Sequence, residues 1–152
     1  MSLTQDDFNN GQRLFRGKLN EEFPFDGKTI FKTSSGEFFV RTDYHILPIT
    51  GFFPDIEIYR INGNLVLVFL ASRTYTFIQS IKVIESNTIK PFDGFLPNKV
   101  FSLKNGQVWQ QIDGPNSPCS SSGSVKIVND KQIKVDSWDF YPKIKLIDGK
   151  RI

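Results

Sequence analysis

The sequence predicts an all-β protein made of two tandem, similar small SH3-like barrels or strongly bent sheets packed together, with at most a short N-terminal helix. Phe contributes 15 of the 152 residues and Ala only one, a composition that suits half-buried strands better than helices. Two runs of alternating polarity flank Asn105-Gly106, a pair typical of β-hairpin turns. A similar pattern flanks Ser35-Gly36 in the first half of the chain and indicates a repeated unit. A single continuous β-sandwich is the alternative architecture.

Residues 1–19 are expected to form an N-terminal segment with one short helix and a first strand. Thr4 and Asp7 have the spacing of a capping box, in which each side chain bonds the backbone N–H of the other residue. Asn10-Gly11 is a suitable helix end, so the helix would be very short. The alternation from Phe15 to Leu19 then predicts a strand.

The first β-unit is expected over residues 20–86. Its hairpin is predicted from Thr29 to Thr42, and a loop rich in Pro and Gly follows over residues 43–55. Further strands are predicted at residues 56–61, 65–70 and 75–84. The second of these is apolar at every position, as expected for a strand that is covered on both faces.

Residues 87–152 are expected to repeat that order as the second β-unit. Phe92-Asp93-Gly94 matches Phe25-Asp26-Gly27 ahead of the hairpin. Strands are then predicted at residues 125–127, 133–135 and 143–147. The spacing between matching segments shrinks toward the C-terminus, so the repeat is imperfect. Several matching segments in the same order nevertheless favour a duplication over chance.

The second hairpin is expected to turn at Asn105-Gly106. A type I′ turn needs positive φ at both central residues, which Asn-Gly accepts at low cost. With those two residues as the turn, Ser102 would pair with Trp109, and Trp109 would lie on the face opposite Leu103. Phe39 would take the equivalent place in the first hairpin.

Three features of the second unit resemble one known family: Phe92-Asp93-Gly94, the hairpin segment Phe101-Ser-Leu-Lys-Asn-Gly-Gln-Val-Trp109, and the basic alternating strand near the C-terminus. The family comprises short bacterial β-domains without an assigned activity. The resemblance implies a small SH3-like barrel in the second unit and, more weakly, in the first, where Ser35 and Phe39 replace Asn and Trp. It implies no catalytic residues.

Composition argues against several functional classes. The formal net charge is +3, and residues 81–152 hold 11 Lys and Arg against 7 Asp and Glu, a mild excess that is typical of a solvated surface. Cys119 is the one cysteine, which excludes an intrachain disulfide and a multi-cysteine zinc site. No apolar run is long enough to span a membrane, and the sequence shows no signal-peptide pattern. We therefore expect a cytoplasmic protein without a cofactor, a metal or a membrane partner.

An enzyme is one of three functional hypotheses, and a non-enzymatic role is favoured over it. The sequence has no P-loop, no dinucleotide-binding glycine motif, no zinc-protease motif and no hydrolase nucleophile motif. His45 is the one histidine, and Asp43 stands two residues before it, so the pair would suit a general base if the fold brought them together. Cys119 has no obvious cation nearby in the sequence to activate its thiol.

The favoured hypothesis is a non-enzymatic binding or protein-interaction module, with a protein or peptide partner of unknown identity. Exposed rings at Trp109 and Phe39, flanked by Lys99, Lys104 and Arg41, would form twin platforms for a peptide or for single-stranded nucleic acid. The alternative is that each ring packs between the two units, because units of this size gain stability from mutual burial. We expect burial.

Nucleic-acid binding is the remaining hypothesis, and it would use a basic surface on the second unit. The candidate residues are Lys126, Lys134, Lys143, Lys145, Lys150 and Arg151. Lys143 and Lys145 share one face of an extended strand. The same pattern is also usual for an outer strand that its lysines protect against strand-to-strand aggregation.

Overall fold

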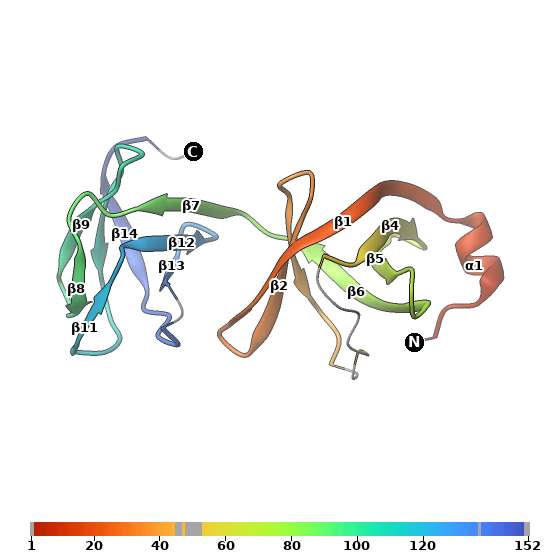
Figure 1. The fold of residues 1–152 in the computed structure, drawn as a ribbon, viewed down its shortest axis with the longest axis horizontal. Helices are drawn as coiled ribbons and strands as arrows, with labels where there is room; N and C mark the ends of the chain where they lie inside the picture. Colours follow the sequence, from red (N-terminus) through yellow and green to blue (C-terminus); the bar gives the residue numbers. More distant parts are fainter. Residues whose placement is uncertain (1, 45–46, 48–52, 137, 151–152) are drawn as a thin grey trace. The chain divides into compact units, whose positions relative to one another are not determined.

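The computed structural model describes residues 2–44, 47, 53–136 and 138–150. It confirms the all-β prediction, because this part of the chain holds 14 strands and one short helix. The chain divides into two compact units, Met1–Ser80 (unit 1) and Ile81–Ile152 (unit 2), which Figure 1 traces in colour from red to blue. The division falls earlier than the predicted boundary at residue 86, because β7 (Val83–Asn87) pairs with a strand of unit 2.

The helix α1 (Gln5–Asn10) begins at the predicted capping box. Asp7 N–H donates to Thr4 Oγ1 at 3.2 Å, and Thr4 N–H donates to Asp7 Oδ2 at 2.8 Å. These bonds satisfy two N–H groups at the start of the helix, and they hold the pKa of the Asp7 carboxyl below its usual range. Phe8 packs edge-to-face on Tyr59 with ring centroids 5.6 Å apart, which fixes α1 beside β4 (Asp55–Ile61).

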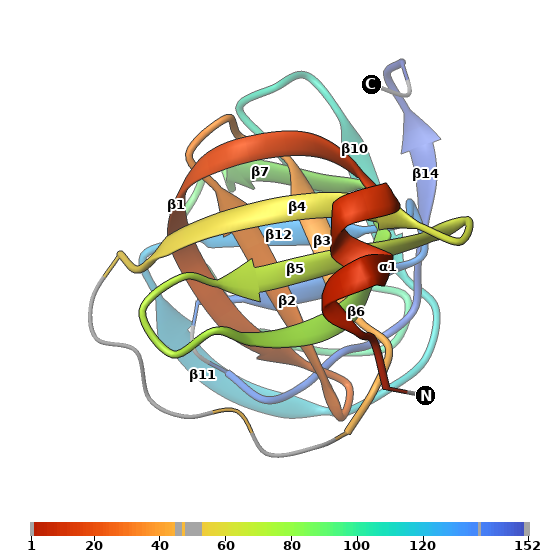
Figure 2. The same cartoon turned by 90° about the vertical axis from the view of Figure 1, so that its right-hand side faces the viewer.

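Unit 1 is a closed six-stranded barrel. Its strands are β1 (Gln12–Phe25), β2 (Lys28–Thr33), β3 (Phe38–Arg41), β4, β5 (Asn64–Phe69) and β6 (Thr74–Ser80), in the order β1-β2-β3-β6-β5-β4. Figure 2 shows these strands wrapping around one another, with α1 in front. The long β1 pairs with β4 through its first half and with β2 through its second, after a register shift between Leu19 and Glu21. The strand predicted in residues 15–19 is therefore part of the barrel and does not belong to a separate N-terminal segment.

Unit 2 arranges its main strands in the same cyclic order. Its strands are β7, β8 (Phe92–Phe95), β9 (Val100–Ser102), β10 (Val108–Gln111), β11 (Ser117–Ser121), β12 (Ser124–Val128), β13 (Gln132–Val135) and β14 (Ile144–Asp148). They form the sheets β14-β10-β9, β13-β12-β7 and β11-β8. The bridges Thr88–Leu103 and Gln132–Lys143 join the first two sheets at both ends. The resulting circuit, β7-β9-β10-β14-β13-β12, corresponds to β1-β2-β3-β6-β5-β4 of unit 1.

Each unit has an apolar core of its own. In unit 1 the core includes Phe31, Ile56 and Leu67, and in unit 2 it includes Trp109, Ile127 and Val135. These residues are at most 1% exposed. The inward-facing residues of neighbouring strands thus bury one another, as alternation along a half-covered strand requires.

The two hairpins lie where the sequence predicts them, but their turns are not type I′. In the second hairpin, Leu103 N–H donates to Gln107 O at 2.9 Å and Gly106 N–H donates to Leu103 O at 3.1 Å. In the first, Thr33 bonds Glu37 and Gly36 in the same way, at 3.0 and 2.9 Å. Both loops therefore have three residues, with the glycine alone at positive φ (92° and 87°).

The longer loop changes the predicted register by one residue. Trp109 pairs with Phe101 instead of with Ser102, and Phe39 pairs with Phe31 in the same way. A shift of one residue moves a side chain to the other face of a strand. Trp109 consequently lies on the inner face of its hairpin.

The two Phe-Asp-Gly segments do not play equivalent roles. Asp26 and Gly27 form the tight turn between β1 and β2, with φ of 49° and 77°. Asp93 and Gly94 instead lie within β8, which pairs with β11. An added Cβ at Gly94 would lie 2.8 Å from the Cα of Pro118, so this glycine allows the two backbones to approach closely.

Candidate functional site

Trp109 and Phe39 do not form the predicted exposed platforms. Trp109 is fully buried, and Phe39 is 5% exposed. Trp109 packs in the core of unit 2 and Phe39 in the core of unit 1. The cause is the hairpin register, which places Trp109 opposite Phe101 on the inner face. The expectation of burial is thus correct, but each ring packs within the core of its own unit.

The basic residues predicted to flank the platforms have different surroundings. Arg41 Nε donates to Asp43 Oδ1 at 2.9 Å and to Thr76 Oγ1 at 2.8 Å, which fixes the end of β3 to β6. Lys104 is exposed at the hairpin turn. Lys99 lies elsewhere, on the wall of a groove in unit 2. Of the three predicted basic residues Arg41, Lys99 and Lys104, Lys99 is therefore the one that lines this groove.

Lys134 is not part of a basic surface, because it is only 5% exposed. Its Nζ lies 5.3 Å from the centroid of the Tyr141 ring and donates to Trp138 O at 3.3 Å. Burial lowers the pKa of the Lys134 ammonium, and the neighbouring Lys126 adds to this effect, while Asp139 opposes it.

The other predicted basic residues fall into separate groups. Lys126 lies 3.7 Å from Glu85 across the β7·β12 pair, which partly neutralises its charge. Lys145 is exposed in β14, and Lys143 and Lys150 are exposed just before and after that strand. Arg151 lies outside the described residues. Nucleic-acid binding therefore stays a prediction of the sequence.

The enzyme hypothesis gains no support from the described residues. His45 lies outside them, and Asp43, its predicted partner, accepts hydrogen bonds from Arg41, from Thr76 and from the backbone N–H of Phe77. Cys119 is half-buried, and burial raises the pKa of its thiol, which is the opposite of activation. Within the described ranges, no three His, Cys, Asp or Glu side chains gather as a metal site would require.

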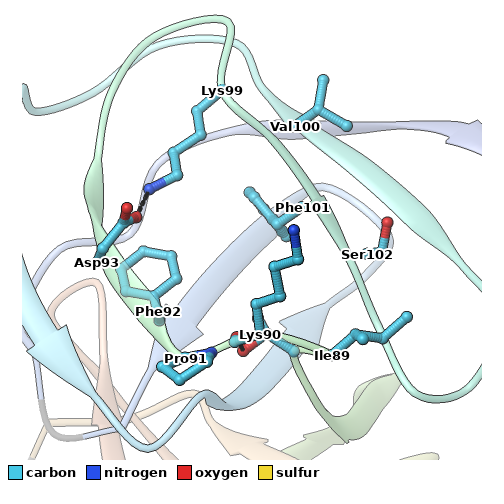
Figure 3. A pocket seen from close by; sticks show the side chains of 10 residues that line it. Ile89, Lys90, Pro91, Phe92, Asp93, Lys99, Val100, Phe101 and Ser102 are labelled. Carbon is cyan, nitrogen blue, oxygen red and sulfur yellow. Dashed lines mark hydrogen bonds and ion pairs between the residues drawn. The ribbon is translucent and has the colours of Figure 1, made fainter.

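The candidate site is a groove of about 390 Å³ in unit 2. Residues 88–93 form one wall and residues 99–102 form the other (Figure 3). Phe92 and Phe101 are buried in the core and close the inner side of the groove. Ile89 and Val100 are 61% and 47% exposed, so the groove presents apolar side chains to solvent. A concave site of this size with exposed apolar groups is typical of a ligand-binding surface.

Charged groups lie at one end of the groove and midway along it. Figure 3 shows Lys99 and Asp93 at one end, Ile89 and Ser102 at the other, and Lys90 between them. Lys99 Nζ forms an ion pair with Asp93, donates to Gly94 O at 2.9 Å and lies 5.1 Å from the centroid of the Phe92 ring. The hydrogen bond from Lys99 lowers the pKa of the Asp93 carboxyl. Lys90 is exposed and has no ion pair among the described residues, so its charge is available to a ligand.

Sequence reasoning identified Lys99 but missed the groove. Val100 and Ile89 carry no motif, and the sequence match with Phe25-Asp26-Gly27 places Phe92-Asp93-Gly94 only as a segment ahead of the hairpin. One available signal was Pro91, because proline cannot donate a hydrogen bond and therefore interrupts a strand ladder. A second signal was the sequence that follows each Asp-Gly pair. Lys28 follows Asp26-Gly27, whereas Phe95-Leu-Pro-Asn98 follows Asp93-Gly94 and moves the turn away from the glycine.

The helix α1 has six residues, and the described part of the chain contains no helix of the length and apolarity that a membrane crossing requires.

Comparison with known proteins gives no relative from which a function could be inferred. No protein-family model, no curated protein and no solved structure matches the chain.

Proposed function

We propose that this protein is a non-enzymatic binding module and that the groove beside β9 takes up a segment of a partner protein. The observation that carries the proposal is the exposure of Ile89 and Val100 at the rim of a concave site. Isolated apolar side chains on a surface are common, but apolar side chains that line a groove exclude water when a ligand enters. Lys90 adds a cation, which would attract a partner with acidic side chains.

The test is selection of binding peptides from a random displayed library, with two exposed positions of unit 2 as matched variants. Val100→Arg places a long charged side chain at the groove, whereas Ile112→Arg makes the same change at a residue that is 49% exposed and does not line the groove. Selected peptides should bind the wild-type protein and the Ile112→Arg variant. We expect Val100→Arg to weaken binding by at least about tenfold, which corresponds to about 1.4 kcal/mol.

The proposal would be overturned by either of two results. The first is that no peptide is enriched against the folded protein. The second is that the enriched peptides bind both variants equally, because the binding surface would then lie away from Val100.

We further infer that the two units arose by internal duplication. The support is the shared cyclic strand order, together with the identical turn bonds at Gly36 and Gly106. Phe39 and Trp109 also pair in the same way, and they stand at the same distance along the chain from these two glycines. The resemblance to the family of short bacterial β-domains, and the cytoplasmic location, remain predictions from the sequence.

A further inference from the structure

The groove of unit 2 lies where unit 1 has a strand. In unit 1, β2 pairs with β3 on one side and with residues 21–25 of β1 on the other. In unit 2, β9 takes the place of β2 but is the last strand of its sheet. The chain that would cover it bridges at Thr88 and then leaves, because the segment after Pro91 forms β8 and pairs with β11. The edge of β9 therefore borders the groove.

Backbone hydrogen bonds show which groups of β9 point toward the groove. Leu103 N–H donates to Gln107 O, and Gln111 N–H donates to Lys99 O, so the odd-numbered residues of this segment bond β10. In an antiparallel ladder the alternate residues direct their N–H and C=O to the opposite side. Ser102 obeys this rule, since its C=O accepts from Ile89 N–H at 2.9 Å. The N–H and C=O of Val100 consequently point into the groove.

Unit 1 shows what kind of chain suits this edge. Ile30 corresponds to Val100 when the two hairpins are aligned on their turn glycines, and it pairs with Phe23 of β1, while Lys32 pairs with Glu21. Phe23 is buried. Pro24 pairs with Thr29 in the next register position, where the ladder requires no hydrogen bond from the N–H that proline lacks. The strand that occupies the edge in unit 1 is thus acidic at its start and carries an aromatic residue opposite the position of Val100.

We propose that the groove binds an extended peptide as an added strand, antiparallel to β9, with one peptide residue exchanging both backbone hydrogen bonds with Val100. This inference rests on the proposed function and specifies the mode of binding. Strand addition supplies main-chain hydrogen bonds, and neighbouring pockets select the side chains. The side chain opposite Val100 is apolar and contacts Ile89. Ile89 already fills the position opposite Ser102, so the preceding peptide residues turn out of the ladder, where their carboxylates face Lys90. The partner is therefore an acidic-aromatic segment, such as Glu-Glu-Phe-Pro.

The open edge is short, so the bound segment is also short. Ser102 already accepts a hydrogen bond from Ile89, and Asn98 turns away with a φ of 72°. Val100 is the one residue of β9 whose two backbone groups both face the groove without a partner strand. The groove volume of about 390 Å³ matches the low end of the range of roughly 300–1,000 Å³ for ligand sites. Both limits fit a peptide of a few residues.

The experiment uses the full chain and the acetylated, amidated peptide Asn-Glu-Glu-Phe-Pro-Phe, the sequence of residues 20–25, as the probe. Binding is followed by shifts of the backbone amide signals in an NMR titration. The amide signals of Val100 and Ile89 are expected to move. N-methylation of the first Phe of the probe removes the N–H that faces Val100 and should weaken binding at least about tenfold. N-methylation of the second Glu, whose N–H points away, should change the affinity less than about threefold.

A matched pair of protein variants tests the same hydrogen bond from the other side. Val100→Pro removes the N–H that faces the groove and leaves the bonds to β10 intact, since an edge strand tolerates proline at such a position. Val100→Thr keeps the N–H and the branched shape. Only Val100→Pro is expected to lose at least about tenfold in affinity. The amide signals of β10 report that both variants keep the hairpin.

The outcomes separate the mode of binding from the function. Probe binding that is indifferent to both N-methyl groups, or equal for the two variants, overturns strand addition and leaves the groove as a binding site. Failure of the probe while library-selected peptides bind at Val100 also overturns the inference, because the occupant would not resemble residues 20–25. Self-association that Val100→Pro abolishes would identify a second copy as the occupant and overturn it as well. Absence of any peptide binding overturns both proposals.

Discussion

Trp109 Nε1 donates a hydrogen bond to Oε1 of Gln107 at 3.2 Å, and both side chains are buried in unit 2. The same Gln107 oxygen accepts from Asn105 Nδ2 at 3.0 Å, and Gln107 Nε2 donates to Lys150 O at 2.9 Å. The Gln107 amide therefore bonds the indole N–H of Trp109, a side chain in the hairpin turn and a backbone carbonyl that follows β14. A buried ring whose polar group is bonded in this way stabilises the fold and is not free to stack on a ligand.

Replacement of Trp109 should destabilise unit 2. Trp109→Ala removes a fully buried ring and leaves the Gln107 amide partly unpaired, so the free energy of unfolding should fall by about 3–5 kcal/mol. Urea denaturation followed by far-UV circular dichroism measures this loss. Trp109→Phe keeps most of the ring and should be milder. A Trp109→Ala variant as stable as the wild-type protein would contradict the core role.

The hairpins illustrate what local sequence determines and what it does not. Asn105-Gly106 and Ser35-Gly36 identify both turns, because a glycine at positive φ is a local requirement. The register depends on whether the loop has two or three residues, and Asn-Gly fits both. In the structure Asn105 accepts a hydrogen bond from Gln107 N–H at 3.0 Å and thereby supports the three-residue loop. The third loop residue decides whether Trp109 faces inward, and the first hairpin forms the same loop with Ser35 in place of Asn105.

The groove depends on contacts between segments far apart in the sequence, so a local pattern could not reveal it. Phe25-Asp-Gly27 and Phe92-Asp-Gly94 read alike, yet the first turns and the second extends. The difference arises because β8 finds a partner in β11, which follows only after the whole β9–β10 hairpin. The edge of β9 becomes visible only when the pairing of β9 is compared with that of β2. The basic-surface prediction failed at Lys134 for a related reason, since the chain after β13 covers it.

Replacing the turn glycine of either hairpin with alanine should destabilise the protein by a similar amount, because the two turns have the same conformation. Gly36 and Gly106 have φ of 87° and 92°, and an added Cβ would meet no atom within 4 Å at either position. The penalty is therefore backbone strain alone, about 1–2 kcal/mol for each Ala variant. Asn tolerates this conformation better, so Gly106→Asn should be less harmful. Urea midpoints of the three variants check the order, and a neutral Gly106→Ala would exclude the left-handed turn.

The buried ammonium of Lys134 should make the stability depend on pH at the alkaline end. Its pKa is lowered from 10.5 by burial, so between the folded and the unfolded pKa the unfolded chain binds more protons. Stability then rises with pH across that window, and the cost of burying the charge is complete below it. The free-energy difference between Lys134→Met and the wild-type protein should accordingly shift in favour of the wild type from pH 7 to pH 10. The exposed Lys131→Met serves as the control, and equal pH profiles for the two variants would refute the assignment.

Phe39→Trp should stabilise unit 1, because the structure leaves room for the larger ring. Phe39 lines a pocket of about 240 Å³ that Thr33, Ser35 and Glu37 also line. At the equivalent positions of unit 2, Trp109 and Gln107 are buried and bonded to each other. An indole at position 39 could donate to the Glu37 carboxylate in the same way, and filling such a space typically raises the free energy of unfolding by about 0.5–2 kcal/mol.

Phe31→Trp is the matched control for this prediction. Phe31 is 1% exposed and does not line the pocket, so overpacking should lower the free energy of unfolding by about 1–3 kcal/mol. Urea denaturation that finds both variants destabilised would show that Phe39 already fills its site.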